Sequence, residues 1–279
     1  RGDHHSFESE MRLLARLRHP RITTVMGAVR GEEAMLVMEL MRYGSLADLY
    51  LNELIDVDGD MAQTILLDVA AGMEFLHCNK PPICHGDLKG GNILVDDRFR
   101  AKVSDFGMAS TGRRKLAGTP YWIAPEVLLG GRSSRASDVF AFGITMVELF
   151  RRGSPYTGHS HVEVLREVVD PNKQRRPSIP NGCGPMLKSL MGKCWLADPA
   201  ARPDMTQVRE LLECTDVREY EAVWQRRRPA MDSPMAGWRR GMQRGSVCSE
   251  QSASILFSLF PEHVAQAMMR GEQPEEDRR

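Results

Sequence analysis

The chain lacks an excess of charge, a long apolar run and clustered cysteines. Lysine plus arginine equals aspartate plus glutamate at 37 each, so no overall field draws the chain to nucleic acid or to an anionic membrane surface. No apolar run approaches the roughly 20 residues of a membrane-spanning helix. The six cysteines form no Cys-x-x-Cys pair and no cysteine–histidine cluster at zinc-ligand spacing. We therefore expect a globular protein with reduced thiols and no nucleic-acid partner, either cytoplasmic or the cytoplasmic part of a larger membrane protein.

The pattern of apolar residues predicts an α+β fold. A helix is expected from Phe7 to Leu17, where apolar side chains recur at helical spacing. Two β-rich stretches, 22–29 and 34–40, flank turn-like residues and predict a hairpin. A small sheet with one helix, followed by a larger helical part, suggests two lobes with a cleft between them. The other expected elements are helices near 45–54 and 61–77 and short strands at 93–95 and 101–103.

The composition changes near Val217 and divides the chain into three expected parts. Residues 218–253 are rich in arginine, proline, glycine and serine, which is typical of a solvated linker. From Ser254 onward, apolar residues return at helical spacing. The expected parts are a folded domain over 1–215, a basic, serine-rich linker over 216–253 and an amphipathic helix over 254–279.

Three polar signals lie in order within ICHGDLKGGNILVDDRFRAKVSDFG, which spans residues 83–107. Asp87 lies five residues before Asn92, Lys89 lies between them, and Asp105 begins the tripeptide Asp-Phe-Gly. Any one of these signals could occur by chance. Together, at these spacings, they resemble the catalytic loop and metal-binding tripeptide of the protein kinase family. The loop is of the serine/threonine type, and the overall order of motifs is most similar to the tyrosine-kinase-like group.

This resemblance implies a role for each polar residue. Asp87 would accept or orient the proton of the substrate hydroxyl, and Lys89 would offset the charge of the transferred γ-phosphoryl group. Asn92 and Asp105 would hold the Mg²⁺ that bridges the phosphates of ATP. ATP and Mg²⁺ are therefore the expected cofactors, and a protein is the expected substrate.

Segments ahead of the loop resemble the nucleotide-binding parts of a kinase. Glu10 matches the helix glutamate that pairs with the phosphate-binding lysine. The backbone groups of Glu39 and Met41 match the hinge that binds the adenine edge, and Leu94 matches the apolar residue beneath the adenine ring. A solvated helix residue is the alternative for Glu10, and ordinary core packing is the alternative for the others.

The glycine-rich G-x-G-x-x-G loop and the strand lysine that kinases place before this helix are missing ahead of Glu10. The resemblance therefore implies a bilobal, protein-kinase-like fold with an incomplete N-terminal lobe and a mainly helical C-terminal lobe. Because the missing parts cover the ATP phosphates, we expect the chain by itself to be weakly active or inactive.

Further matches concern structure and control. Glu126 of GTPYWIAPE should form a partly buried ion pair with Arg202, and Asp138 should anchor the backbone of the catalytic loop. His85 should be packed and hydrogen-bonded instead of acting as a base. Gly86 stands where most kinases carry the arginine that receives an activation-loop phosphate, so control by such a phosphate would be unconventional.

The segment SILFSLFPEHVAQAMMRGEQ, at 254–273, resembles the helix that precedes the catalytic domain of class III nucleotide cyclases. The resemblance implies a homodimer through 254–270 and a guanylate or adenylate cyclase domain downstream. Docking of this helix on the larger lobe is the alternative. The predicted function is ATP-dependent phosphoryl transfer to serine or threonine hydroxyls. The alternatives are a kinase-like regulatory domain that controls an attached cyclase, and a binding scaffold with no nucleotide role.

Overall fold

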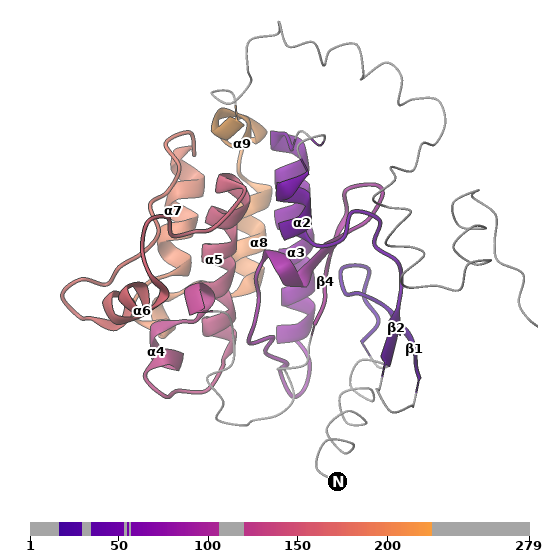
Figure 1. The fold of residues 1–279 in the computed structure, drawn as a ribbon, viewed down its shortest axis with the longest axis horizontal. Helices are drawn as coiled ribbons and strands as arrows, with labels where there is room; N and C mark the ends of the chain where they lie inside the picture. Colours follow the sequence, from indigo (N-terminus) through magenta and orange to yellow (C-terminus); the bar gives the residue numbers. More distant parts are fainter. Residues whose placement is uncertain (1–16, 30–34, 53–54, 56, 106–119, 225–279) are drawn as a thin grey trace, which may run out of the picture. The chain divides into compact units, whose positions relative to one another are not determined.

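The computed structural model describes residues 17–29, 35–52, 55, 57–105 and 120–224. Most of the helix expected at 7–17, which includes Glu10, and the whole segment expected at 254–279 lie outside the described residues. The described chain is an α+β protein with a small sheet and a larger, mainly helical part, as the sequence predicts (Figure 1).

The strands are β1 (Val25–Val29), β2 (Met35–Met38), β3 (Ile93–Val95) and β4 (Ala101–Val103). β1 pairs with β2 and β3 pairs with β4, both antiparallel. These pairs confirm the predicted hairpin and the two short strands. An isolated bridge between Ile22 and Val103 joins the chain ahead of β1 to β4. The β1–β2 pair is therefore connected to the β3–β4 pair, which follows the segment containing Asp87 and Asn92.

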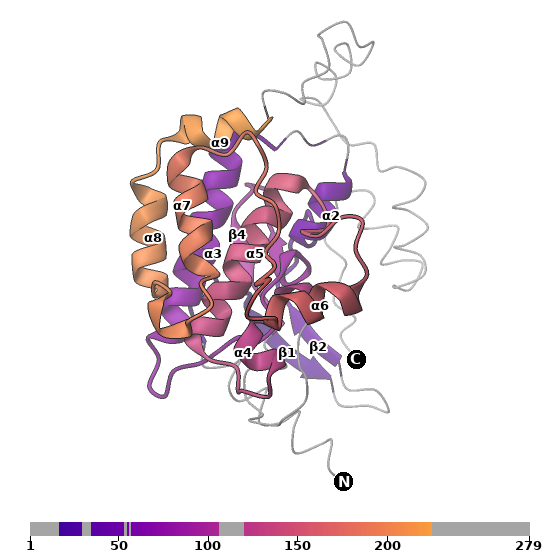
Figure 2. The same cartoon turned by 90° about the vertical axis from the view of Figure 1, so that its left-hand side faces the viewer.

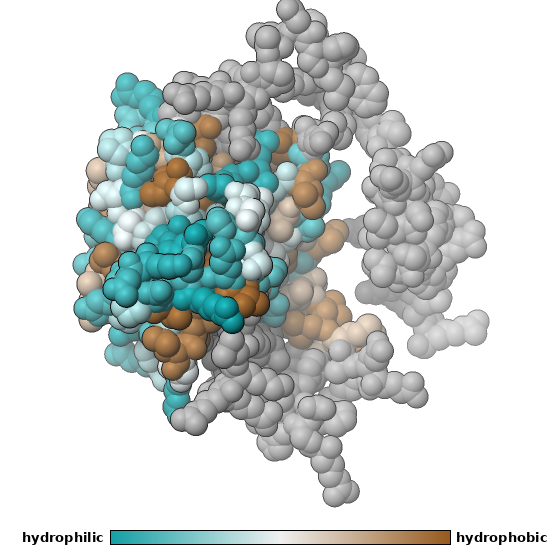
Figure 3. Space-filling view, turned by 60° about the vertical axis from the view of Figure 1, so that its left-hand side comes forward, coloured by the Kyte–Doolittle hydropathy of each residue, from teal (hydrophilic) through white to brown (hydrophobic). Residues whose placement is uncertain are grey.

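The helices of the described residues are α2 (Leu46–Leu51), α3 (Gly59–His77), α4 (Pro125–Leu128), α5 (Arg135–Arg151), α6 (His161–Val169), α7 (Pro185–Cys194), α8 (Met205–Glu213) and α9 (Val217–Trp224), with short 3-10 turns η1 (Gly90–Asn92), η2 (Pro120–Trp122) and η3 (Pro199–Ala201). Figures 1 and 2 show α3, α5, α7 and α8 packed side by side. The face seen in Figure 3 is largely hydrophilic, with hydrophobic residues in small groups.

Helix α5 lies at the centre of the helical part. Every residue from Ser137 to Phe150 is buried, and a helix buried on all sides needs packing partners on all sides. α3, α7 and η2 supply them. Two of the buried residues, Asp138 and Glu148, are acids, and both bond to the loop between α3 and β3.

Helix α9 occupies the first residues of the segment expected as a linker. It packs on α3, and Tyr220 is fully buried, with Val223 beside it in the core. Val217, Tyr220 and Val223 recur every three residues, a helical stripe that the arginine-rich composition hides. The folded part therefore extends to Trp224, and the rest of the expected linker, 225–253, lies outside the described residues.

The described residues bear on two expectations from composition, which concern membrane-spanning helices and the state of the cysteines. None of the helices there is long and apolar enough to span a bilayer. The five cysteines there form no disulfide with one another.

The predicted ion pair between Glu126 and Arg202 is confirmed. Nη1 of Arg202 lies 2.7 Å from Oε1 of Glu126, and Nη2 lies 2.8 Å from Oε2. The Arg202 side chain is fully buried, and its guanidinium lies over the ring of Phe140 in α5. A planar, bidentate contact of this kind is directional, so it fixes the start of α4 against the central helix.

We predict that Glu126→Ala lowers the free energy of unfolding by about 3 kcal/mol, because it leaves the buried guanidinium of Arg202 without its carboxylate. Urea unfolding of the two proteins measures the difference. Glu213→Ala is the control: Glu213 pairs with Arg209 but is about half exposed, so its loss should cost less than about 1 kcal/mol. Equal effects of the two substitutions would contradict the structural role of the Glu126 pair.

Candidate active site

The loop between α3 and β3 brings three polar side chains together. Nζ of Lys89 lies 2.7 Å from Oδ2 of Asp87. Nδ2 of Asn92 donates to the Asp87 carbonyl oxygen at 2.8 Å and to Oδ2 of Asp87 at 3.0 Å. The short turn η1 closes this arrangement, because the Asn92 amide donates to the carbonyl of Lys89 at 3.0 Å. The side chains of Asp87 and Lys89 remain 13% and 25% exposed, so a ligand could reach both.

A buried carboxylate in α5 holds the start of this loop. The amides of His85 and Gly86 each donate to Asp138, at 2.9 Å, which confirms the predicted anchor. Nε2 of His77, at the end of α3, lies 2.8 Å from the same carboxylate. Sequence reasoning missed His77; a histidine in the last turn of an otherwise apolar helix face is the only local signal of its role. Asp138 therefore joins α3, α5 and the loop through one side chain.

The backbone on either side of Asp87 explains two residue choices. Gly86 has φ 80°, a left-handed conformation that glycine adopts without steric cost. His85 is fully buried, and its Nε2 lies 2.9 Å from the carbonyl oxygen of Ser104, as expected of a packed, hydrogen-bonded histidine. Nδ1 of His85 accepts the amide of Asp87 at 3.2 Å. The glycine before Asp87 thus satisfies a turn that would strain any other residue.

Asp105 lies beside the loop through its neighbour Ser104. The Ser104 amide donates to the Asn92 carbonyl at 2.9 Å, so the chain that carries Asp105 runs alongside Asn92. Asp105 itself is exposed and has φ 59°. A left-handed conformation is uncommon for residues other than glycine, although aspartate tolerates it better than most. Such a conformation at an exposed carboxylate supports a functional reason for its placement.

The donor set suits a hard cation. Nδ2 of Asn92 is taken up by Asp87, which leaves Oδ1 of Asn92 as the atom that can ligand a metal. Asp105 adds an exposed carboxylate. Mg²⁺ prefers such oxygen donors and is commonly bound by one or two protein groups together with substrate phosphates. The two residues fit a cation that is shared with a nucleotide.

A second carboxylate of α5 holds the end of the loop. Oε2 of Glu148 accepts the Gly90 amide at 2.9 Å and the indole N–H of Trp122 at 3.2 Å. Burial raises the pKa of Glu148 to about 7, against the opposing effect of these two hydrogen bonds and of the nearby charge of Lys89. Sequence reasoning missed Glu148, although an acid inside the apolar run FGITMVELF is a signal, since glutamate is seldom buried.

The segment that includes Glu39 and Met41 is held close to β3, which carries Leu94. The Gly44 amide donates to the Met41 carbonyl at 3.0 Å, and the Val95 amide donates to the Gly44 carbonyl at 2.9 Å. Leu94 itself bridges to Ser45. The structure thus places all three expected adenine-contacting residues along adjacent backbone segments.

The Glu39 side chain has a structural role of its own. Its carboxylate pairs with Lys102 of β4 at 2.6 Å and accepts the Thr24 amide at 2.6 Å. Burial opposes ionisation, but these hydrogen bonds outweigh it and lower the pKa of Glu39. The side chain thus fixes the segment against β4 and against Thr24, just ahead of β1. The Glu39 amide donates to the Thr24 carbonyl at 3.0 Å, so the carbonyl oxygen is the backbone atom of Glu39 that can face a ligand.

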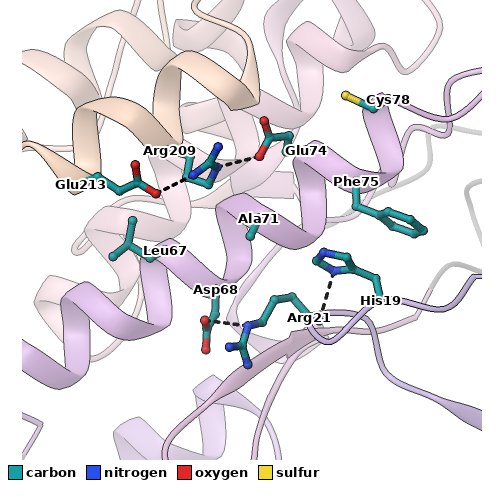
Figure 4. A pocket seen from close by; sticks show the side chains of 10 residues that line it. All are labelled: His19, Arg21, Leu67, Asp68, Ala71, Glu74, Phe75, Cys78, Arg209 and Glu213. Carbon is teal, nitrogen blue, oxygen red and sulfur yellow. Dashed lines mark hydrogen bonds and ion pairs between the residues drawn. The ribbon is translucent and has the colours of Figure 1, made fainter.

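A cavity lies away from this loop, between α3, α8 and the chain ahead of β1 (Figure 4). Its volume is about 550 Å³. Its charged groups pair with one another: Nε of Arg21 lies 2.8 Å from Asp68, and Nε of Arg209 lies 2.7 Å from Glu74. The lining is His19, Arg21, Leu67, Asp68, Ala71, Glu74, Phe75, Cys78, Arg209 and Glu213. These ion pairs join α3 to α8 and to the chain ahead of β1, which is a structural role. The candidate active site is therefore the loop between α3 and β3 and not this cavity.

The chain is similar to known protein kinases. A family model described as protein tyrosine and serine/threonine kinase matches residues 1–212. Probable serine/threonine-protein kinase drkD of Dictyostelium discoideum is 37% identical over 209 residues, which is 73% of this chain and 16% of that protein. Dual specificity protein kinase shkC of the same organism is 33% identical, covering 75% and 43%. Serine/threonine-protein kinase CTR1 of Arabidopsis thaliana is 36% identical, covering 74% and 26%. The chain spans less than half the length of these relatives.

We predict that Glu148 makes the protein less stable as the pH rises from about 5 to 8. The pKa of Glu148 is higher in the folded protein than in the unfolded chain, so its contribution is fully present below the unfolded pKa and is lost as the pH rises through about 7. Relative to a Glu148→Gln variant, the wild-type free energy of unfolding should fall by about 2–3 kcal/mol over this interval. Urea unfolding at several pH values measures it. Parallel curves for the two proteins would contradict the shift.

Proposed function

Because this chain belongs to the protein tyrosine and serine/threonine kinase family, we propose that it transfers the γ-phosphoryl group of ATP to serine or threonine hydroxyls of a protein substrate. The observation that carries the proposal is the contact of Asp87 with both Lys89 and Asn92. A base, a cation and an amide oxygen are thereby collected in one loop. Phosphoryl transfer needs this kind of positioning and charge compensation more than it needs covalent chemistry.

Each loop residue has a distinct part in the proposed reaction. Asp87 accepts or orients the proton of the attacking hydroxyl. Asn92 holds the Asp87 carboxylate in place through a hydrogen bond from Nδ2. Lys89 balances the carboxylate in the resting loop, and its partly exposed ammonium offsets the charge of the incoming phosphoryl group. Since Lys is a flexible point charge, it can serve both partners without a change in the backbone.

The proposed nucleotide site extends from the loop toward β2. Asn92 and Asp105 would hold Mg²⁺, which offsets the charge of the ATP phosphates when bound. The Glu39 and Met41 backbone would bond the adenine edge, and Leu94 would pack beneath the ring. Glu10, the expected partner of a phosphate-binding lysine, lies outside the described residues. This stretch of sequence contains no glycine-rich loop or strand lysine ahead of Glu10, so we expect it to bind ATP weakly by itself.

The regulatory alternative depends on residues 254–273, which resemble a cyclase-preceding helix but lie outside the described residues. The homodimer through 254–270, the downstream cyclase and a cytoplasmic location therefore remain predictions. Catalysis has the stronger support, because a purely regulatory or scaffolding domain has no need to keep Asp87, Lys89, Asn92 and Asp105 together.

The test is Asp87→Asn in the longest polypeptide that carries this sequence. Loss of the base should lower kcat for transfer to a generic serine/threonine protein substrate by about 100-fold or more, with little change in the affinity for Mg²⁺ and ATP. Incorporated phosphate and phosphoamino-acid analysis provide the measurement.

The matched control is Asp97→Asn, at an exposed aspartate between β3 and β4. It should transfer phosphate at the wild-type rate. Equal rates for the wild type and Asp87→Asn would refute the proposed function, and so would phosphate found on tyrosine alone.

A further inference from the structure

Helix α9 lies beyond the part of the chain that matches the kinase family model. The match ends at residue 212, and α9 spans Val217–Trp224. Gln63 of α3 holds the turn that leads into α9, because its Nε2 donates to the carbonyl oxygens of Leu212 and Thr215, at 3.4 and 3.0 Å. The attachment of α9 is therefore a property of this chain outside the matched region.

Glu219 of α9 caps the start of α7. Its Oε2 accepts the amides of Met186 at 2.9 Å and Leu187 at 3.2 Å. The first amides of a helix have no carbonyl partner within that helix. Pro185 has no amide hydrogen, and the N-cap residue Gly184 makes no side-chain cap. A carboxylate at this place also faces the positive end of the helix dipole, so α7 takes from α9 the cap that its own sequence lacks.

The N-cap glycine of α7 makes room for this contact. A Cβ atom added to Gly184 would lie 2.4 Å from both Cγ and Oε2 of Glu219, so a side chain there would displace the carboxylate. Serine, threonine, asparagine and aspartate are the residues that usually cap a helix from this position. Glycine gives up that local cap, and the first turn of α7 therefore depends on α9 being in place.

Two apolar side chains anchor α9 in the core. Tyr220 is fully buried, and its ring meets that of Phe150, near the end of α5, edge-on with 6.3 Å between the centroids. Val223 is 8% exposed and belongs to the same core. α9 also packs on α3 and α7 (Figure 2). Helices α3, α5 and α7 thus all contact this one short helix.

A helix as short as α9 is not stable without its packing partners. It has 8 residues, and isolated helices shorter than about 12–15 residues are marginal in water. Its helical state therefore depends on the burial of Tyr220 and Val223. When these anchors leave the core, the helix unfolds and the carboxylate of Glu219 is no longer held against α7. Native proteins commonly open in such contiguous units, without global unfolding.

We propose that α9 is a reversible clasp on the folded domain: it opens as one unit with the first turn of α7, and Glu219 couples the two. The chain continues from Trp224, directly after the anchor Val223, so a force applied to the following residues reaches the clasp first. The clasp gives those residues an effect on α7 that does not pass through the catalytic loop. This inference goes beyond the proposed function and holds whether or not the chain transfers phosphate.

The test is hydrogen–deuterium exchange at neutral pH in the longest polypeptide that carries this sequence, followed by mass spectrometry of the peptides 184–190 and 217–224. Glu219→Ala removes the cap and should speed exchange in both peptides about tenfold. Val223→Ala weakens an anchor and keeps the cap residue, and it should also speed exchange in both peptides, by about tenfold or more. Exchange in the central helix, 137–150, should stay at the wild-type rate.

The matched control is Glu210→Ala, at an exposed glutamate of α8. It makes the same change of residue within a helix, so it alters helix propensity equally but leaves the cap in place. Both peptides should exchange at the wild-type rate in this variant. If Val223→Ala fails to fold, Glu219→Ala decides the question, since Glu219 is only partly buried.

Several outcomes would overturn the clasp. Val223→Ala could speed exchange in 217–224 alone, so that the start of α7 does not depend on docking of α9. Glu219→Ala could speed exchange in 184–190 alone, so that the cap does not hold α9. Either variant could speed exchange in 137–150 by the same factor, which is global unfolding, or Glu210→Ala could match the effect of Glu219→Ala.

Discussion

The carboxylate of Asp138 is the contact on which the geometry of the site depends. It lies 1% exposed in α5 and accepts the amides of His85 and Gly86, with His77 of α3 on the same oxygen as His85. Two consecutive amides bonded to one carboxylate leave the backbone little freedom. The next residue is Asp87, so its direction is set by a group that never meets the substrate. Preorganised positions of this kind are where phosphoryl transfer gains most from the protein.

Helix α5 thus works as a rigid support for the loop, with an acidic residue near each end of the helix. Asp138 holds the loop at His85 and Gly86, and Glu148 holds it at Gly90. Asp87 and Lys89 lie between these two points, and Asn92 follows Gly90 by two residues. Buried acids are a weak source of stability, and the raised pKa of Glu148 shows that burial works against its charge. The apolar packing around α5 supplies the stability that these acids do not. The helix combines a stable core with costly groups that fix the loop.

Much of the fold and of the candidate site could be predicted from the sequence. The features that could not be predicted were missed for physical reasons. The spacing of Asp87, Lys89 and Asn92 indicated their shared loop because all three are close in the chain. The kinase family predicted from that loop and the α+β fold predicted from the apolar pattern are both confirmed. Glu126–Arg202 followed from the family pattern. Glu148 and His77 were missed, since their partners are backbone amides or distant side chains that only the fold brings near. Helix α9 was missed because its three apolar positions are diluted by charged residues.

The central claim is that one buried carboxylate in α5 positions the catalytic loop for phosphoryl transfer. The most direct test is the rate of phosphate incorporation by Asp138→Asn in the longest polypeptide that carries this sequence. The substitution keeps the size of the side chain, but asparagine cannot accept hydrogen bonds at both of its terminal atoms. Binding of Mg²⁺ and ATP, measured in parallel, shows whether the variant is folded. The account predicts retained nucleotide binding with kcat lowered about 100-fold. Retained binding with a wild-type kcat would contradict it.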